Sequence, residues 1–483
     1  MIGRIWDRVI QYPKWACILL GAGVALGHAP LSLWPISLLC LIAFLALARH
    51  SVTPFRYGWI FGFGYFGITL NWIVEPFLVD IQTTGFMAPF ALVLMSGGLA
   101  VFWGVAGSVA RILGPIGWVV GLSLAEFLRG ILFTGFPWGL LSYTQAENPF
   151  VGIFAWVGPH GATLFLLVIC YLCARRSWKL AALVCAIVGT CTWIPLPEIQ
   201  GDTPNTTVRL VQPNAPQEQK WDPLYAPLFF DRMIDATRAD PPVDLIVWPE
   251  SALAPALNYA SAEIAEIRSA AGNADIIFGV LRLDARDQLF NTLALSREKQ
   301  ELQIYDKAHL VPFGEYLPFE DWLLRNGFGF APELFGVGFS AGTGAKRLIL
   351  SSGLKVLPLI CYEIIFPRAV AQGRKEADLI VQISNDAWFG TFSGPAQHLE
   401  ITRLRAIEQG MTILRVSNPG ISAVIDGRGQ MVAQMPLNTT GFLDVIVPLS
   451  QYITPYARFG DWIYWILFVA VLFGTLWRRV IKD

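Results

Sequence analysis

Charged side chains are scarce in this sequence. Asp, Glu, Lys and Arg together make up 15% of its 483 residues, whereas soluble domains usually contain roughly 25%. The formal net charge is -1, so the charge balance gives no reason to expect a nucleic-acid partner. Only five histidines are present. Because they are scattered along the chain, we expect no metal site, and we expect no other cofactor.

Cysteine is nearly absent from one long part of the chain. Six of the seven cysteines lie in or beside apolar segments: Cys17, Cys40, Cys170, Cys173, Cys185 and Cys191. Between residues 205 and 455 the single cysteine is Cys361, which ends the apolar run Leu-Pro-Leu-Ile-Cys. A thiol that is alone in its domain cannot form a disulfide there. Cys361 is therefore either a small buried apolar residue or a nucleophile.

Long apolar stretches are abundant in the rest of the chain. Hydrophobic residues make up 54% of the sequence, and their distribution predicts membrane-spanning helices near 15–29, 31–48, 57–77, 86–110, 112–132, 150–173, 178–195 and 461–477. We therefore expect a transmembrane domain over 1–200 with about seven helices, a globular domain over 205–455, and a last transmembrane helix and tail over 459–483. Pro115, Glu126 and Arg129 interrupt the fifth segment. We expect Glu126 and Arg129 to pair or to face the membrane interface, with a headgroup-binding role as the lesser alternative.

Basic residues indicate how these helices are oriented. If eight spans alternate in direction, the clusters of Lys and Arg all fall on one side: Arg4, Arg8, Lys14, Arg49, Arg56, Arg111, Arg175, Arg176, Lys179, Arg478, Arg479 and Lys482. The opposite connections, around 78–85 and 133–149, contain no Lys or Arg. The positive-inside rule places the basic side in the cytoplasm. Both termini are then cytoplasmic, and the 205–455 domain lies outside the cytoplasm.

The 205–455 region alternates short apolar runs with helical patterns. Strands are expected at 208–212, 245–248, 276–281, 292–296, 302–305, 348–350, 356–360, 379–383, 413–416 and 422–425, and helices at about 224–238, 261–271 and 395–410. This alternation predicts a layered α/β domain. Glu250, Lys307 and Cys361 each follow a predicted strand. Since α/β sheets commonly place their chemistry at strand ends, the three side chains are candidates for one site.

Three motifs in this order resemble those of a known superfamily. Trp-Pro-Glu around Glu250, Lys-Ala-His-Leu-Val-Pro-Phe-Gly-Glu from Lys307, and Cys-Tyr-Glu from Cys361 are similar to the Glu-Lys-Cys triad of the carbon-nitrogen hydrolase (nitrilase) superfamily. The resemblance implies an αββα sandwich. A nitrilase-like domain between about seven spans and one further span resembles the apolipoprotein N-acyltransferases of the bacterial inner membrane. This resemblance covers essentially the whole chain.

The resemblance implies a two-step acyl transfer. Cys361 takes a fatty acyl chain from a phospholipid, with phosphatidylethanolamine as the expected donor, and holds it as a thioester. The chain then passes to the free α-amine of a diacylated apolipoprotein. Glu250 would act as the base, and Lys307 would stabilise the thiolate and the negative charge of the intermediate. The site would lie in the periplasm, on the outer face of the inner membrane.

Further residues are expected to support this chemistry. The main-chain N–H of Tyr362 would serve the oxyanion hole, Glu315 would orient Lys307 or the substrate amine, and Glu363 would support the loop after the nucleophile. Trp221 is expected either near the substrate entrance or as an interfacial anchor. Asn385 would shape the pocket wall. The aromatic, glycine-rich segment 322–343 is interpreted as an arm that gates acyl chains.

Two other readings of the sequence compete with acyl transfer. The chain could be a membrane-tethered amidase or nitrilase that acts on a small soluble compound. The many spans argue against this reading, because tethering requires only one. The chain could instead be a transporter or scaffold with an inactive hydrolase fold. The presence of Glu250, Lys307 and Cys361 together argues against that reading.

Overall fold

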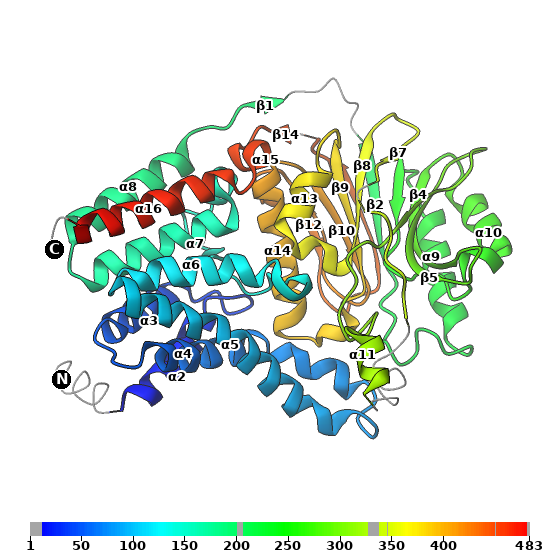
Figure 1. The fold of residues 1–483 in the computed structure, drawn as a ribbon. Helices are drawn as coiled ribbons and strands as arrows, with labels where there is room; N and C mark the ends of the chain where they lie inside the picture. Colours follow the sequence, from blue (N-terminus) through cyan, green and yellow to red (C-terminus); the bar gives the residue numbers. More distant parts are fainter. Residues whose placement is uncertain (1–11, 200–205, 327–337, 345, 450, 481–483) are drawn as a thin grey trace.

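The computed structural model describes residues 12–199, 206–326, 338–344, 346–449 and 451–480. Its first part is a bundle of helices (Figure 1). The helices of the bundle are α2 (Pro13–Ala25), α3 (Trp34–Ala48), α4 (Pro54–Thr69), α5 (Ala88–Leu113), α6 (Gly117–Arg129), α7 (Ile153–Ala174), α8 (Trp178–Trp193) and α16 (Trp462–Val480). Proline occupies the first turn of α2, α3, α4 and α5, where its missing N–H leaves no helical hydrogen bond unmade. A helix overlaps each of the eight predicted segments.

Two of these helices are long and apolar enough on their own to cross a membrane. They cover Gly85–Leu113 and Ile153–Ala174. Small residues allow the shorter helices to pack closely: a Cβ at Gly21 of α2 would collide with the carbonyl oxygen of Phe61 on α4. Such close approach of one helix to the backbone of another at a small residue is typical of helix packing within membranes.

The second part contains two six-stranded sheets. The first has the order β13-β2-β3-β4-β5-β6 and the second the order β12-β11-β10-β9-β8-β7. Their strands are β2 (Thr206–Gln212), β3 (Leu245–Val247), β4 (Asp275–Leu283), β5 (Leu289–Ser296), β6 (Gln303–Asp306), β7 (Leu348–Ile349), β8 (Lys355–Ile360), β9 (Leu379–Ser384), β10 (Ile413–Ser417), β11 (Ser422–Ile425), β12 (Met431–Met435) and β13 (Gly441–Val447). Both sheets are mixed, with parallel pairing along β2-β3-β4 and β8-β9-β10. A short pair, β1 (Glu198–Ile199) with β14 (Gln451–Tyr452), joins the two parts of the chain.

The sheets pack face to face, with helices on their outer faces. Val208 and Val247 of the first sheet share a buried apolar core with Val381 and Val416 of the second. Helices α9 (Ala226–Arg238) and α10 (Ser261–Ala271) pack on the first sheet. Helices α13 (Pro367–Gly373) and α14 (Ser393–Gln409) pack on the second sheet. The predicted α/β domain is therefore present as an αββα arrangement.

Helix α14 also joins the sheets to the helical bundle, on which its other side packs (Figure 1). Trp138 Nε1 donates a hydrogen bond to Gln397 Oε1 at 2.7 Å. Arg405 Nη2 donates to the hydroxyl of Tyr143 at 2.7 Å. The segment 136–147 of the bundle thus lies on the same helix that supports the second sheet.

All ten predicted strands and all three predicted helices of this domain are found. Strands β12, β13 and β14, helix α13 and two short helices, α11 (Glu320–Arg325) and α15 (Pro455–Phe459), were not predicted. Strand β12 is mostly exposed, so it lacks the apolar pattern that identifies a buried strand. Half of the predicted 322–343 arm, residues 327–337, lies outside the described residues, as do Arg4, Arg8 and Lys482.

Glu126 and Arg129 pair inside the bundle. Arg129 Nη2 lies 3.0 Å from Glu126 Oε2, and both side chains are fully buried. Arg129 also donates to the carbonyl oxygens of Phe136, Trp138 and Gly139. Every one of these contacts is internal to the protein, so the pair holds the segment that faces α14.

Candidate active site

Glu250, Lys307 and Cys361 converge from the ends of three strands. Glu250 follows β3, while Lys307 and Cys361 come directly after β6 and β8. Strands β3 and β6 belong to the first sheet and β8 to the second. Because the two sheets face each other, these strand ends meet at one edge of the sandwich. Lys307 Nζ lies 3.6 Å from Glu250 Oε1.

The backbone of Cys361 is held in an unusual conformation. Its φ is 50°, in the left-handed region that non-glycine residues rarely occupy and that is often found at functional sites. The carbonyl oxygen of Cys361 accepts a hydrogen bond from Gln382 Nε2 at 3.3 Å and lies 3.3 Å from His398 Nε2. These contacts from β9 and α14 hold the turn that presents the thiol.

Cys361 is buried, with 6% of the residue exposed. Burial raises its pKa, the negative charge of Glu250 raises it further, and the positive charge of Lys307 opposes both. The resting thiol is therefore protonated near neutral pH. A nucleophilic role requires that a neighbouring base remove this proton as the thiol attacks.

Glu250 is held in place by two hydrogen-bond donors. Its Oε1 accepts from Asn291 Nδ2 at 2.7 Å, and its Oε2 accepts from the main-chain N–H of Asn385 at 2.8 Å. The Glu250 side chain is 7% exposed. A buried carboxylate fixed by such donors is preorganised as a proton acceptor.

Lys307 lies between two carboxylates. Its Nζ is 2.8 Å from Glu315 Oε1, closer than to Glu250. Burial lowers the pKa of Lys307, but Glu315 and Glu250 together outweigh burial and raise it above its ordinary value. The ammonium therefore remains charged. Glu315 is itself held by the main-chain N–H of Val311, which donates to its Oε2 at 2.8 Å.

Glu363 and Tyr362 have different positions in the site. The Glu363 carboxylate accepts hydrogen bonds from the hydroxyl of Tyr305 and from the main-chain N–H groups of Ala308, His309 and Ile360. Through these hydrogen bonds the Glu363 carboxylate holds the loops that carry Lys307 and Cys361. The Tyr362 side chain points to the bundle, where its hydroxyl lies 3.5 Å from the Gly135 carbonyl oxygen.

A buried charged cluster, which was not predicted from the sequence, lies behind Cys361. Asp386 Oδ1 lies 2.9 Å from His398 Nδ1, and Asp386 Oδ2 lies 2.5 Å from Arg415 Nη2. Burial would raise the pKa of Asp386, but Arg415 and His398 lower it well below its usual range. Asn291, Gln382 and Lys220 were missed as well. Their positions in the sequence do not predict that they meet, since each reaches the site from a different element.

A cavity of about 540 Å³ opens beside Glu250. Lys220, Trp221 and Glu250 line it together with apolar residues of α9 and the segment 252–255. Trp221 is 40% exposed. The structure therefore places Trp221 at a cavity that reaches the proposed base.

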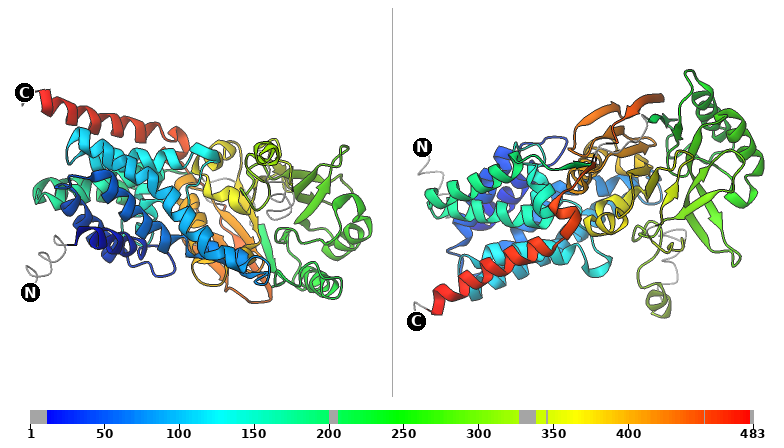
Figure 2. Two further views of the ribbon diagram at one scale, coloured as in Figure 1. Left: turned by 60° about the horizontal axis from the view of Figure 1, so that its bottom comes forward. Right: turned by 90° about the horizontal axis from the view of Figure 1, so that it is seen from above.

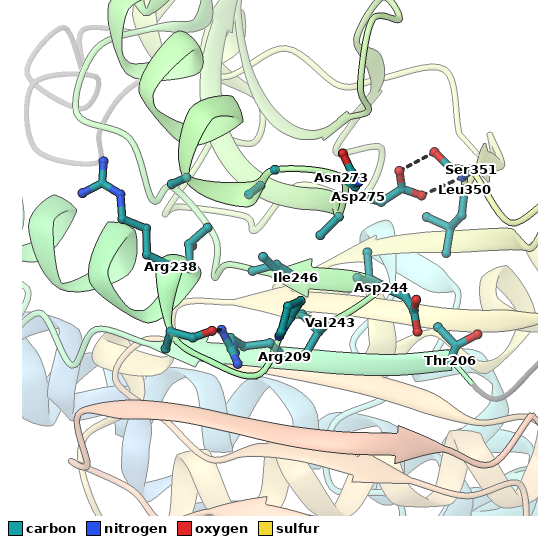
Figure 3. A pocket seen from close by; sticks show the side chains of 18 of the residues that line it. Thr206, Arg209, Arg238, Val243, Asp244, Ile246, Asn273, Asp275, Leu350 and Ser351 are labelled. Carbon is teal, nitrogen blue, oxygen red and sulfur yellow. Dashed lines mark hydrogen bonds between the residues drawn. The ribbon is translucent and has the colours of Figure 1, made fainter.

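A second cavity, of about 660 Å³, lies at the opposite end of the first sheet (Figure 3). Thr206, Asp244 and Asp275 line it where β2, β3 and β4 begin. The Asp275 carboxylate accepts a hydrogen bond from Ser351 Oγ at 2.6 Å. None of the predicted site residues borders this cavity. Among the described residues, no group of three His, Cys, Asp or Glu side chains could hold a metal ion.

Two family models match this chain. Residues 20–172 match the apolipoprotein N-acyltransferase N-terminal domain, and residues 207–456 match carbon-nitrogen hydrolase. An amidase from Nesterenkonia sp., known from a crystal structure, is 18% identical with a TM-score of 0.39, over 54% of this chain and 94% of that chain.

Curated relatives match along nearly the full length. Apolipoprotein N-acyltransferase from Caulobacter vibrioides is 36% identical over 94% of this chain and 93% of the relative. The protein of the same name from Brucella melitensis is 33% identical over 98% of each. The chain belongs to the apolipoprotein N-acyltransferase family.

Proposed function

We propose that this protein transfers a fatty acyl chain from a glycerophospholipid to the N-terminal amine of diacylglyceryl-cysteine in apolipoproteins, the last step of bacterial lipoprotein maturation. One observation carries the proposal. A buried thiol in a left-handed turn lies with a fixed carboxylate and a charged lysine, in a chain related along almost its whole length to apolipoprotein N-acyltransferases.

In the first half-reaction, the sulfur of Cys361 attacks the ester carbonyl carbon of the phospholipid. Glu250 accepts the thiol proton as the S–C bond forms. Lys307 offsets the negative charge of the tetrahedral intermediate, as does the main-chain N–H of Tyr362 in this scheme. The C–O bond to glycerol then breaks, and Glu250 returns the proton to that oxygen. The lysophospholipid leaves, and the acyl chain remains as a thioester.

In the second half-reaction, the free α-amine of the apolipoprotein attacks the thioester carbonyl carbon. Glu250 accepts a proton from the nitrogen, the C–S bond breaks, and the proton returns to the sulfur of Cys361. The products are an amide-linked third acyl chain and the free enzyme. Water would compete with the amine for the thioester, so the low exposure of Cys361 favours transfer over hydrolysis.

The proposal includes eight membrane-spanning helices with the sheet domain in the periplasm and phosphatidylethanolamine as the donor. Beyond the two long helices, the helices have 13 to 19 residues, so flanking apolar residues would complete their passage. Large apolar side chains on α2, α5 and α16 point outward, including Trp15, Leu94 and Phe473. The start of α2 and the end of α16 both lie at the end of the bundle remote from the sheets (Figure 2). This arrangement supports placing both termini in the cytoplasm.

Membrane attachment also has a kinetic consequence. The donor and the acceptor are both lipids or lipid-anchored. A site held at the membrane surface raises their effective concentration and limits their orientations.

Intact-mass spectrometry of the purified protein after incubation with phosphatidylethanolamine tests the proposal. We expect wild type to gain the mass of one fatty acyl chain, and hydroxylamine to remove it. Cys361→Ala should gain nothing. Adding a diacylated lipopeptide should discharge the wild-type thioester and yield a triacylated peptide. If wild type gains no mass while it cleaves small amides, the protein is a tethered amidase.

A protease site inserted in the exposed turn between β4 and β5, at 284–287, tests the topology. Protease added to intact spheroplasts should cleave it. Cleavage only after lysis would place the sheet domain in the cytoplasm and overturn the proposed orientation.

A further inference from the structure

Lys220 is a buried cation beside the proposed base. It lies in the connection between β2 and α9, and its side chain is 7% exposed. Its Nζ donates one hydrogen bond, at 3.0 Å, to the main-chain oxygen of Glu250. An ammonium has three N–H donors. Within the described part of the chain, no carboxylate lies close enough to Lys220 to form an ion pair, although the charge of Glu250 acts on it at longer range.

The connection between β2 and α9 carries Lys220 and is held by residues that directly follow two strands of the second sheet, β9 and β10. Asn385 Nδ2 donates to Gln217 Oε1 at 2.9 Å. The main-chain N–H of Ala215 donates to Asn418 Oδ1 at 2.7 Å. The Lys220 ammonium also lies 5.3 Å from the ring centre of Trp221. These contacts hold the charge in one place, so it is preorganised for a ligand.

The surroundings of Lys220 are suited to a ligand that combines an anion with apolar parts. Lys220 lines the 540 Å³ cavity, whose other walls include Phe229, Phe230 and Leu253. Leaving a buried charge unpaired costs free energy, and an anionic ligand would remove that cost. Lys220 is the one basic residue among the described residues that line the cavity, which also include Glu250, Glu263 and Glu266, so an anion attached to a hydrophobic body is favoured at its ammonium.

Of the two proposed substrates, only the donor carries such an anion near its reacting bond. A glycerophospholipid has a phosphodiester on the same glycerol as the ester that Cys361 attacks. The reacting end of the acceptor is an amine, which is cationic when protonated and would be repelled by a second ammonium. The charge of Lys220 therefore selects the donor.

We propose that Lys220 binds the phosphodiester of the acyl donor in the cavity beside Glu250 and is a specificity-determining residue for phosphate-bearing donors. This inference rests on the proposed function. In this arrangement Lys220, which directly precedes Trp221, recognises the headgroup side of the lipid. Glu250, Lys307 and Cys361 act on the ester.

The protonation of Lys220 gives a further observable. Burial lowers its pKa to about 8, against the opposing effects of Glu250 and Cys361. Glu263 and Glu266 of α10 also line the cavity. Because the ammonium loses its charge as the pH rises through about 8, the KM for the phospholipid should increase above that pH. An uncharged donor should not show this increase.

The test compares two donors on Lys220→Met, Lys220→Arg and wild type. The donors are phosphatidylethanolamine and the p-nitrophenyl ester of a fatty acid, which has no phosphate. Thioester formation is followed by intact mass, and folding by thermal unfolding in detergent. Lys299→Met, at an exposed lysine that contacts Glu298, is the matched control and should behave as wild type.

We expect Lys220→Met to lower the ratio of kcat/KM for the phospholipid to that for the nitrophenyl ester at least tenfold, mainly through KM. Lys220→Arg should restore most of the ratio, because it retains the charge. An equal loss on both donors would mean that Lys220 acts through Glu250, and would overturn the inference. If wild type accepts the nitrophenyl ester but no phospholipid, the proposed function fails instead.

A measurement on wild type alone covers the case in which Lys220→Met does not fold. Glycerophosphoethanolamine, the headgroup without acyl chains, should compete with the nitrophenyl ester at pH 7 and should inhibit at least severalfold less at pH 9. Inhibition that does not change between these pH values, or no inhibition at either, would count against a phosphate site at Lys220.

Discussion

Glu363 Oε1 accepts a hydrogen bond from the main-chain N–H of Ala308 at 2.8 Å. Glu363, two positions after Cys361, therefore holds Ala308, which directly follows Lys307. The same carboxylate accepts from the main-chain N–H of Ile360, just before the nucleophile, at 2.8 Å. Through Glu363 the two sheets are locked together at the edge where the site lies.

Glu363→Gln should reduce activity by misplacing Cys361 and Lys307. The amide would put an NH₂ group against N–H donors, leaving at least one buried donor without an acceptor, at a cost of about 1–3 kcal/mol. We expect a lower Tm and a drop in kcat of at least tenfold. Thermal unfolding and thioester formation measure the two effects. Wild-type activity in a well-folded variant would show that this bonding does not matter to the site.

Glu250→Gln should prevent acylation of Cys361 with little effect on folding. The amide cannot accept the thiol proton, and general-base catalysis typically contributes about 10²–10⁴-fold. We expect thioester formation to slow by at least 100-fold. Glu301→Gln, at an exposed carboxylate outside the cavity, is the control for the loss of a negative charge. Normal phospholipid consumption by Glu250→Gln would remove Glu250 from the mechanism.

Alkylation of Cys361 by iodoacetamide should be slow near neutral pH. Since burial and Glu250 raise the pKa of this thiol, the reactive thiolate is rare at pH 7 and increases as the pH rises. In wild type the rate at Cys361, followed by peptide mass, should still be increasing at pH 9. A plateau below pH 7 would indicate a resting thiolate and would contradict the need for a base.

Arg129→Met should destabilise the bundle without altering the chemistry directly. It leaves the buried carboxylate of Glu126 without its cation, and breaking a buried pair in this way costs about 3–5 kcal/mol. We expect a clearly lower Tm in detergent. Arg111→Met, at an exposed residue in the last turn of α5, should leave the Tm nearly unchanged. If both variants unfold alike, the internal contacts of Arg129 are not stabilising.

The regular elements and the order of the three motifs could be predicted from the sequence, because both depend on residues close together in the chain. Apolar runs long enough for a helix identified the helices of the bundle, and short apolar runs identified the ten buried strands. Exposed β12 was missed for the same reason, since its pattern is not that of a buried strand.

What only the tertiary structure decided is which distant groups meet. Asn291 holds Glu250 from 41 residues away, and Lys220 approaches the same residue from a loop 30 residues upstream. His398, on a helix that faces the bundle on its other side, lies against the carbonyl of Cys361. A side chain gains such a partner only when strands distant in the chain pair within a sheet and loops and helices pack on it, and burial then shifts the pKa values of the groups that meet. The sequence by itself determined which reactive groups the chain carries. The packing of the strands and of α14 decided which of these groups meet, and therefore which residues position the site and shift its pKa values.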